Sequence, residues 1–479
     1  MRARIFADEY RKWWTLGALS FALFMIMLDN TIVNVALPAI KSDLGIGTSE
    51  LEWVVTAYAL TFAVLLLTGG KLGDLYGRRL IFTIGLIVFT GSSLACGLSS
   101  SATELIGARA VQGVGSALMM PATLSIITAT FAARERGMAI GVWAGVSAMA
   151  LAIGPLLGGV ITEHISWNWI FFVNVPIGIL GVVASIVVVP ESKDTSHEQR
   201  LDLPGLLSSG IGLLALVYAL IEAHKYGWTS ARILSLFVIA ALALAAFVFV
   251  ELRQRVPLLD LNLFRNGTFT GANIVAILVT LAMFGIFVFF PIYMQTFLGW
   301  SPIQAGAALL PWTILIVIFA PIAGKLSDRV GSRWLMAAGM STVGLCCLWL
   351  STVTLNSSFW HLLPGFVLGG LGMSFVMTPM SAAVMGAAPV EKAGVASGVL
   401  NTFRQVGVAL GIAITGAIIT NREAAALRGG ADPPHAFVHG LTFGMRVSAV
   451  ICFAGALAAA LLVRQYRQAD QTQALAEPA

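Results

Sequence analysis

Two charged residues lie deep inside apolar stretches of this sequence, where an ionisable side chain is costly and is normally paired or functional. Asp29 is the one acid far from both ends of such a stretch, and Arg109 lies at a similar depth in another. Burial favours the protonated form of a carboxyl group, whereas a nearby arginine favours the ionised form. The positions therefore predict a site that takes up and releases a proton. A static ion pair that holds two helices in register is the alternative.

The stretches around these residues have the composition of a membrane protein. Hydrophobic residues make up 58% of the chain and charged residues 11%, and the mean hydropathy is +0.89, whereas soluble domains carry roughly 25% charged residues. A bilayer-spanning helix needs about 20 residues, and fourteen apolar segments reach that length. Their approximate ranges are 14–37, 51–70, 80–99, 104–128, 137–161, 169–189, 204–222, 231–250, 269–297, 303–323, 335–354, 361–385, 394–420 and 441–463.

Lysine and arginine residues orient these segments. The first apolar run, from Trp13 to about Leu37, is too long for the core of a secretory signal, so we expect it to remain as a membrane helix. If the N-terminus is cytoplasmic, most of the 28 basic residues lie on the cytoplasmic side, as in other membrane proteins. The sequence therefore predicts a multi-pass protein of the cell inner (plasma) membrane with both termini in the cytoplasm.

A charged sequence occurs twice and indicates an internal duplication. Residues 70–79 read Gly-Lys-Leu-Gly-Asp-Leu-Tyr-Gly-Arg-Arg, and residues 324–333 read Gly-Lys-Leu-Ser-Asp-Arg-Val-Gly-Ser-Arg. Each copy is expected to form a short turn between two long hydrophobic segments. Duplicated helical bundles are the architecture of secondary transporters.

The spacing of the two copies predicts the domain plan, because the same shift carries Trp14 to Thr268. Residues 1–189 are expected to form an N-terminal six-helix bundle and residues 268–463 a C-terminal one. Residues 190–267 would hold a polar linker and two inserted membrane helices, and residues 464–479 a cytoplasmic tail.

Further motifs lie in order on the predicted helices. They are Leu28-Asp-Asn-Thr-Ile-Val-Asn-Val-Ala-Leu-Pro38, Arg109-Ala-Val-Gln-Gly-Val-Gly115, Gly154-Pro-Leu-Leu-Gly-Gly159, Trp167-Asn-Trp-Ile-Phe-Phe-Val-Asn-Val-Pro176, Leu201-Asp-Leu-Pro-Gly205 and Asn401-Thr-Phe-Arg-Gln-Val-Gly407. Together with the repeated turn, this set resembles the major facilitator superfamily, in particular its fourteen-helix drug/proton antiporter branch. Two positions depart from the pattern: Ala150 stands where glycine is frequent, and Asn168 replaces a common arginine. The resemblance implies an all-α membrane protein with two six-helix bundles, two inserted helices and a proton-coupling role for Asp29 and Arg109.

For the repeated turns, the resemblance implies a cytoplasmic latch that closes when the transport site faces outward. Glycines allow close helix approach, and Asp74 is expected to accept hydrogen bonds from a helix N-terminus or to pair with Arg78 or Arg79. Basic side chains that merely mark the cytoplasmic side are the alternative. The predicted latch residues are Gly70, Lys71, Gly73, Asp74, Gly77, Arg78, Arg79, Gly324, Asp328, Arg329, Gly331 and Arg333.

Two further groups of residues have predicted roles. The resemblance makes Gly154, Pro155, Gly158 and Gly159 an antiporter motif that acts as pivot and seal, with a kinked packing surface as the alternative. Arg404 is expected to join a hydrogen-bonded structural network, with a contact to substrate as the second interpretation. Residues that could line a cavity are Asn30, Asn34, Gln112, Gln295, Asn401, Arg404 and Gln405.

These features predict a proton-driven exporter of small hydrophobic or cationic molecules that has no catalytic residues. The sequence has no nucleotide-binding loop and no cysteine or carboxylate cluster beside His435 and His439, so we expect no cofactor and no metal. Protons and membrane lipids are the expected partners, and nucleic acid is not. A lipid or fatty-acid exporter on the same scaffold is an alternative; an integral-membrane enzyme and a nutrient importer are disfavoured.

Overall fold

The computed structural model describes residues 8–193, 202–254 and 257–464, and all regular structure in those ranges is helical. Most of the predicted polar linker (194–201) and nearly all of the predicted tail (465–479) lie outside the described residues. The first bundle packs α3 against α5, α4 against α5 and α8, and α2 against α6. Its helices are α2 (Asp8–Leu44), α3 (Thr48–Tyr76), α4 (Arg78–Leu98), α5 (Ala102–Thr130), α6 (Ala133–His164), α7 (Trp169–Phe172) and α8 (Asn174–Val188).

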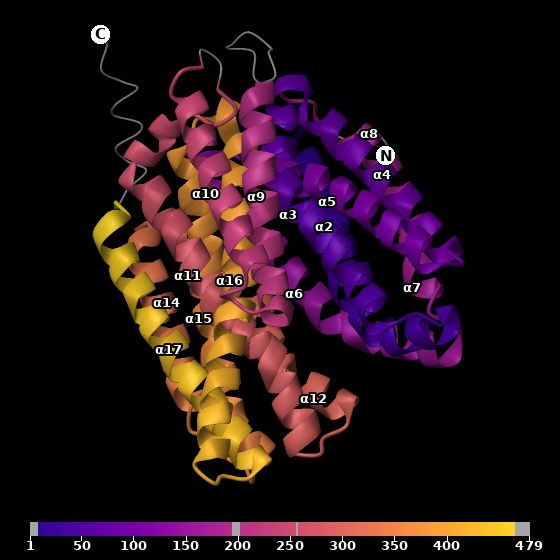
Figure 1. The fold of residues 1–479 in the computed structure, drawn as a ribbon. Helices are drawn as coiled ribbons and strands as arrows, with labels where there is room; N and C mark the ends of the chain where they lie inside the picture. The colour runs from indigo at the N-terminus through magenta and orange to yellow at the C-terminus, as the bar shows by residue number, and fades with distance from the viewer. Residues whose placement is uncertain (1–7, 194–201, 255–256, 465–479) are drawn as a thin grey trace.

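The second bundle repeats this arrangement, with α13 against α15, α14 against α15 and α17, and α11 against α16 and α17. Its elements are α11 (Gly267–Ile292), a π-helical turn η2 (Tyr293–Phe297), α12 (Pro302–Ala308), α13 (Leu310–Val330), α14 (Ser332–Leu350), α15 (Phe359–Ala387), a 3-10 turn η3 (Val390–Lys392), α16 (Ala393–Arg428) and α17 (Pro433–Leu462). Figure 1 shows the first bundle in indigo to magenta and the second in salmon to yellow.

Two inserted helices connect the bundles. They are α9 (Leu203–Tyr226) and α10 (Ala231–Glu251), which pair with each other and are followed by a short 3-10 turn, η1 (Leu261–Arg265). Helix α9 contacts α3 of the first bundle and α16 of the second. Stacking of Trp53 against Tyr218, with ring centroids 5.9 Å apart, belongs to the contact with α3.

Thirteen helical stretches of the described residues are long and apolar enough to span a membrane. The 32-residue α6 is a further long helix, so each of the fourteen predicted segments corresponds to a helix or a pair of consecutive helices. Several helices extend well beyond the apolar segment, as α2 and α16 do, because a helix satisfies its own backbone polar groups inside and outside the hydrocarbon layer.

The expectation that residues 70–79 and 324–333 are turns is wrong in one respect. Helix α3 continues to Tyr76 and α4 begins at Arg78, so the chain reverses at Gly77 alone. Likewise α13 continues to Val330 and α14 begins at Ser332. Gly77 and Gly331 have φ angles of 120° and 84°, a region that glycine enters far more readily than other residues. One glycine is therefore enough for each reversal, and Asp74 and Asp328 lie on helices.

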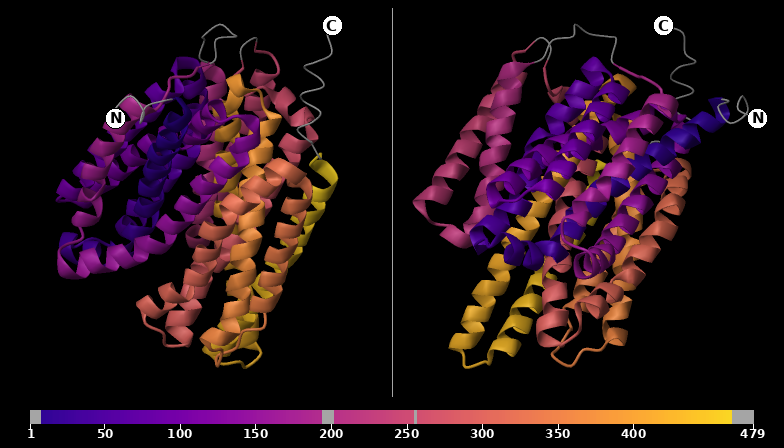
Figure 2. Two further views of the ribbon diagram at one scale, coloured as in Figure 1. Left: turned by 180° about the vertical axis from the view of Figure 1, so that it is seen from behind. Right: turned by 90° about the vertical axis from the view of Figure 1, so that its right-hand side faces the viewer.

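The two bundles meet most closely at the end that carries these reversals, which we call the charged-turn end. There Gly70 of α3 packs against the backbone of Gly394 in α16, and Gly324 of α13 packs against Gly137 in α6. Towards the opposite end, α6 packs within its own bundle, with Gly158 against Ile32 of α2. The views in Figures 1 and 2 agree that the bundles converge at the charged-turn end and diverge towards the other.

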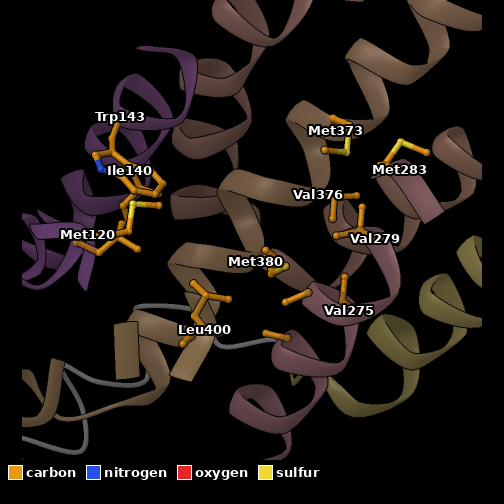
Figure 3. Packing of buried hydrophobic residues seen from close by; sticks show 14 of the residues in the cluster. Met120, Ile140, Trp143, Val275, Val279, Met283, Met373, Val376, Met380 and Leu400 are labelled. Atoms are coloured by element: carbon orange, nitrogen blue, oxygen red, sulfur yellow. The ribbon is translucent and has the colours of Figure 1, made fainter. Parts of the chain in front are cut away.

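Apolar side chains fill each bundle. Figure 3 shows Met283 of α11 with Met373 and Met380 of α15, and shows Met120 and Trp143 as a separate group on α5 and α6. The Trp143 indole donates to the Thr123 hydroxyl at 3.0 Å, so its one polar atom is satisfied inside the core.

A methyl group added at Gly324 should separate α6 from α13. The new Cβ of Gly324→Ala would overlap the carbonyl oxygen of Gly137, and such overpacking typically costs about 1–3 kcal/mol. Gly386→Ala in α15 is the matched control, because nothing lies within 4 Å of its Cβ position. We expect a lower midpoint of thermal unfolding for Gly324→Ala only, measured on purified protein in detergent. Equal midpoints for both variants would contradict the close packing.

Candidate functional site

Asp29 and Arg109 form a fully buried ion pair between α2 and α5. Arg109 donates to one Asp29 carboxylate oxygen at 2.6 Å, and the two residues are 0% and 1% exposed. The guanidinium also donates to the Val54 carbonyl at 3.2 Å and lies 4.2 Å from the centroid of the Tyr58 ring. These contacts hold the arginine against α3, so its orientation does not depend on Asp29 alone.

Two amides complete the surroundings of the carboxylate. Gln112 donates to the second Asp29 oxygen at 2.9 Å and accepts from Arg109 at 2.7 Å. Asn174, at the start of α8, donates to that same oxygen at 3.2 Å and to the Ser93 hydroxyl at 3.1 Å. Gln112 was predicted as a cavity residue, and the structure places it beside Asp29. Asn174 and Ser93 were not predicted as site residues.

Every polar group that the structure places against the Asp29 carboxylate donates a hydrogen bond to it. Donors to both oxygens stabilise the ionised carboxylate. Oδ1 accepts from two amides, so a proton on that oxygen would have to displace one of them, whereas Oδ2 accepts from Arg109 alone, and a proton there would remove the charge that strengthens this bond. The carboxylate of Asp29 thereby joins α2, α5 and α8.

The predicted antiporter motif packs α6 against α2 beside this pair. Cβ atoms at Gly154 and Gly158 would overlap Thr31 and Ile32, which follow Asp29 closely on α2. Gly159 is less confined, since its nearest neighbour, a methyl of Val35, lies 4.0 Å from the Cβ position. Pro155 lies within α6, which continues through it as a helix. Two of the motif's three glycines therefore position the helix that carries Asp29.

Asp74 connects the bundles at the charged-turn end. Its two carboxylate oxygens accept from the backbone N–H groups of Gly394 and Val395, both at 2.8 Å, in the first turn of α16. Free N–H groups and the helix dipole favour a negative charge at this position. Arg78 donates to Asp74 at 2.8 and 3.0 Å and to the carbonyls of Val390 and Glu391. Of the two predicted partners, Arg78 is the one paired with Asp74.

The second copy makes a weaker version of this connection. Asp328 accepts from the N–H groups of Gly137 and Met138 in α6, at 3.0 and 3.3 Å. Ser332 occupies the position of Arg78 and bonds to Ser327 at 2.8 Å. Arg333 lies over the Trp334 ring, 4.9 Å from its centroid, and does not bond to Asp328. The structure gives Arg329 no bonded partner among the described residues.

Other predicted latch residues reach neighbouring segments. Lys71 donates to the Pro257 carbonyl at 2.8 Å, and the Arg79 backbone donates to Glu191 at 3.0 Å.

Lys392, just before α16, donates to Asp260 at 2.6 Å. Partial burial raises the pKa of Asp260, but the bonds from Lys392 and Asn262 and the charge of Lys392 together outweigh burial and leave that pKa below its usual value.

The predicted cavity residues do not converge on one site. Asn30, Asn34 and Asn401 each donate to a carbonyl one turn earlier on their own helix, and Gln295 is exposed in η2. Arg404 and Gln405 are partly buried on α16. Arg404 makes no hydrogen bond, ion pair or ring contact in the described part of the chain, so the expected structural network around it is not seen.

Comparisons with known proteins agree with this architecture. A family model described as Major Facilitator Superfamily matches residues 19–412 and 272–478. The puromycin resistance protein pur8 of Streptomyces alboniger is 37% identical, and the alignment covers 96% of this chain and 93% of that protein. The tetracenomycin C resistance and export protein of Streptomyces glaucescens is 35% identical over 86% of this chain and 77% of that protein.

A solved structure supports the fold. The proton:xylose symporter XylE superposes with a TM-score of 0.67 at 13% identity, covering 96% of this chain and 97% of that one. Because the family is one of transporters, the enzyme alternative is set aside. The chain is a multi-pass membrane transporter and belongs to the Major Facilitator Superfamily.

Proposed function

We propose that the protein exports amphiphilic small molecules in exchange for protons by alternating access, with the charged-turn end in the cytoplasm. The observation that carries the proposal is the set of donors around Asp29, because proton uptake there would either displace an amide from a neighbouring helix or weaken the bond from Arg109. The names of the resistance proteins related to this chain favour export of drug-like compounds. Export of lipids or fatty acids on the same scaffold is the second candidate.

The contacts fit one state of such a cycle. The Asp74 contacts close the charged-turn end, and Asp29 is paired with Arg109. A proton arriving from the opposite end would neutralise Asp29 and weaken its attraction to Arg109. The amide oxygen of Asn174 is buried and has no partner among the described residues, so rotation of this amide would supply an acceptor for the protonated carboxyl group.

The driving force is sufficient without ATP. At about 150–200 mV, one proton supplies roughly 3.5–4.6 kcal/mol. Since about 1.4 kcal/mol corresponds to tenfold, one proton supports a gradient on the order of several hundred- to a thousandfold for a neutral compound.

Asp29→Asn should abolish uphill export while binding of neutral compounds survives. The amide keeps the size of the side chain and cannot titrate, so export driven by a proton gradient should fall to background and substrate-induced proton release should vanish. Resistance profiling of a pump-deficient host would select the compound, drug or lipid, and transport would be measured in proteoliposomes across pH 5–9.

Glu163→Gln is the control for this experiment, because Glu163 is an exposed acid at the C-terminal end of α6. This variant should transport normally. Arg109→Ala should also lose coupled export, because it leaves the buried carboxylate without its counter-charge. Normal uphill export by Asp29→Asn would contradict the assignment and direct attention to Glu52 and Glu222.

Asp74→Asn should open the charged-turn end. Four hydrogen bonds to the carboxylate lose their charge assistance, and bonds to charged groups contribute about 1.5–3 kcal/mol each. We expect a Leu67→Cys reporter, buried against Gly398, to react about tenfold faster or more with an impermeant maleimide added from the cytoplasmic side. The reporter would be placed in a background without the four native cysteines.

Asp328→Asn is the matched comparison, and its effect should be smaller because, within the described part of the chain, Asp328 accepts two hydrogen bonds and has no arginine partner. Unchanged labelling together with full transport by Asp74→Asn would reduce the motif to a marker of membrane topology.

A further inference from the structure

We propose that Arg404 binds the anionic group of a singly charged amphiphilic substrate between the two bundles. This inference rests on the proposed export function and names the class of compound. It begins from the contrast between Arg404 and the two other deeply placed arginines. Arg109 has a carboxylate, an amide and a carbonyl as partners, and Arg78 has a carboxylate and two carbonyls. Among the described residues, Arg404 has no such partner.

The depth of Arg404 makes this lack of a partner costly. It lies about 16 Å along α16 from Ala393, at 1.5 Å per residue, which is about half the thickness of a hydrocarbon layer of roughly 30 Å. Long basic side chains reach the interface only when they lie near the ends of a helix. Arg404 therefore needs water or a counter-ion within the membrane-spanning part of the protein.

Neighbouring contacts indicate which way Arg404 projects. Gly398 of α16 packs on Leu67 of α3, and Gly407 packs on Ile277 of α11. Around the helix, at about 100° per residue, Arg404 lies roughly 20° from Gly411, which packs on Leu281 of α11, and roughly 80° on the other side from Gly394, which packs on Gly70 of α3. Since α3 and α11 belong to different bundles, Arg404 lies on the arc of α16 between its contacts with the two bundles.

The charges around this arc of α16 leave Arg404 uncompensated. The charge of Asp29 is balanced by Arg109, and that of Asp74 by Arg78. The sequences of α11 and α15 contain no acidic residue. A fixed cation without a counter-charge favours a monoanion and disfavours a cation. This reverses the preference for cationic compounds expected from the lone deep acid of the first bundle.

An apolar surface for the rest of the ligand lies further along the same helices. Phe284 and Phe287 of α11 are partly buried, with ring centroids 5.9 Å apart. These rings lie beyond the level of Arg404, towards the opposite end of the molecule. Because Gly407 packs on Ile277, Phe284 lies about 15 Å further along α11 than Arg404, so an elongated compound with an aromatic body and one acidic group would contact both features.

Two dyes that differ by one charge provide the test. 8-Anilinonaphthalene-1-sulfonate is a monoanion, and N-phenyl-1-naphthylamine is the same ring system without the sulfonate. Binding of each dye would be measured by fluorescence on the full-length protein in phosphatidylcholine nanodiscs, with empty nanodiscs subtracted. The variants are Arg404→Gln, which removes the charge, Arg404→Lys, which keeps it, and Arg446→Gln. Arg446 is an exposed arginine on α17, so its variant is the matched control for net charge.

Arg404→Gln should weaken binding of the sulfonate dye at least about tenfold and change binding of the neutral dye less than about twofold. Arg404→Lys should keep most of the sulfonate affinity, and Arg446→Gln should match the wild type. Unchanged sulfonate affinity in Arg404→Gln, with the neutral dye still bound, would overturn the anion site alone. If the wild type binds neither dye, both this inference and export of amphiphilic compounds are contradicted.

Discussion

A carboxylate placed among membrane helices must receive its hydrogen bonds from the protein itself, because the surrounding hydrocarbon offers none. This requirement connects the main features of the structure. Asp29 draws donors from α5 and α8, and Asp74 draws them from α4 and from α16. Each acid therefore fixes the relative positions of helices that apolar packing alone would leave free to slide.

The two acids act at different levels of the architecture. The hydrogen bonds that the structure gives Asp29 lie within the first bundle, whereas Asp74 connects the first bundle to the second. The helix between these levels is α3. It carries Asp74 near its C-terminal end, and near the other end its Val54 carbonyl accepts from Arg109. Arg109 therefore connects Asp29 to α3 at a point about 20 residues from Asp74, or roughly 30 Å of helix.

The parts of the site that depend on charge and depth could be predicted from sequence. The pairing of Asp29 with Arg109 followed from the rarity of deep charges, and the family followed from ordered motifs. Asn174 and Ser93 could not be singled out, because small polar residues are frequent in membrane helices for packing reasons. The first charged turn connects the bundles more strongly than the second because Arg78 of the first is replaced by Ser332 in the second. This difference can be recognised only once the contacts of the two residues are known. The isolation of Arg404 was likewise beyond prediction, since a missing partner can be recognised only in three dimensions.

The inserted hairpin has a consequence for how compounds reach the protein from the lipid. Helix α9 touches α3 and α16 at once, so it covers the line along which the two bundles meet on that side of the molecule. In a transporter built from two bundles, a compound dissolved in the bilayer can enter the interior laterally where the two bundles meet. On the α3–α16 side, the α9–α10 hairpin covers this route. The α6–α13 side has no inserted helix among its described neighbours, and there the two bundles meet directly through α6 and α13, so entry from the lipid on that side would require these two helices to separate.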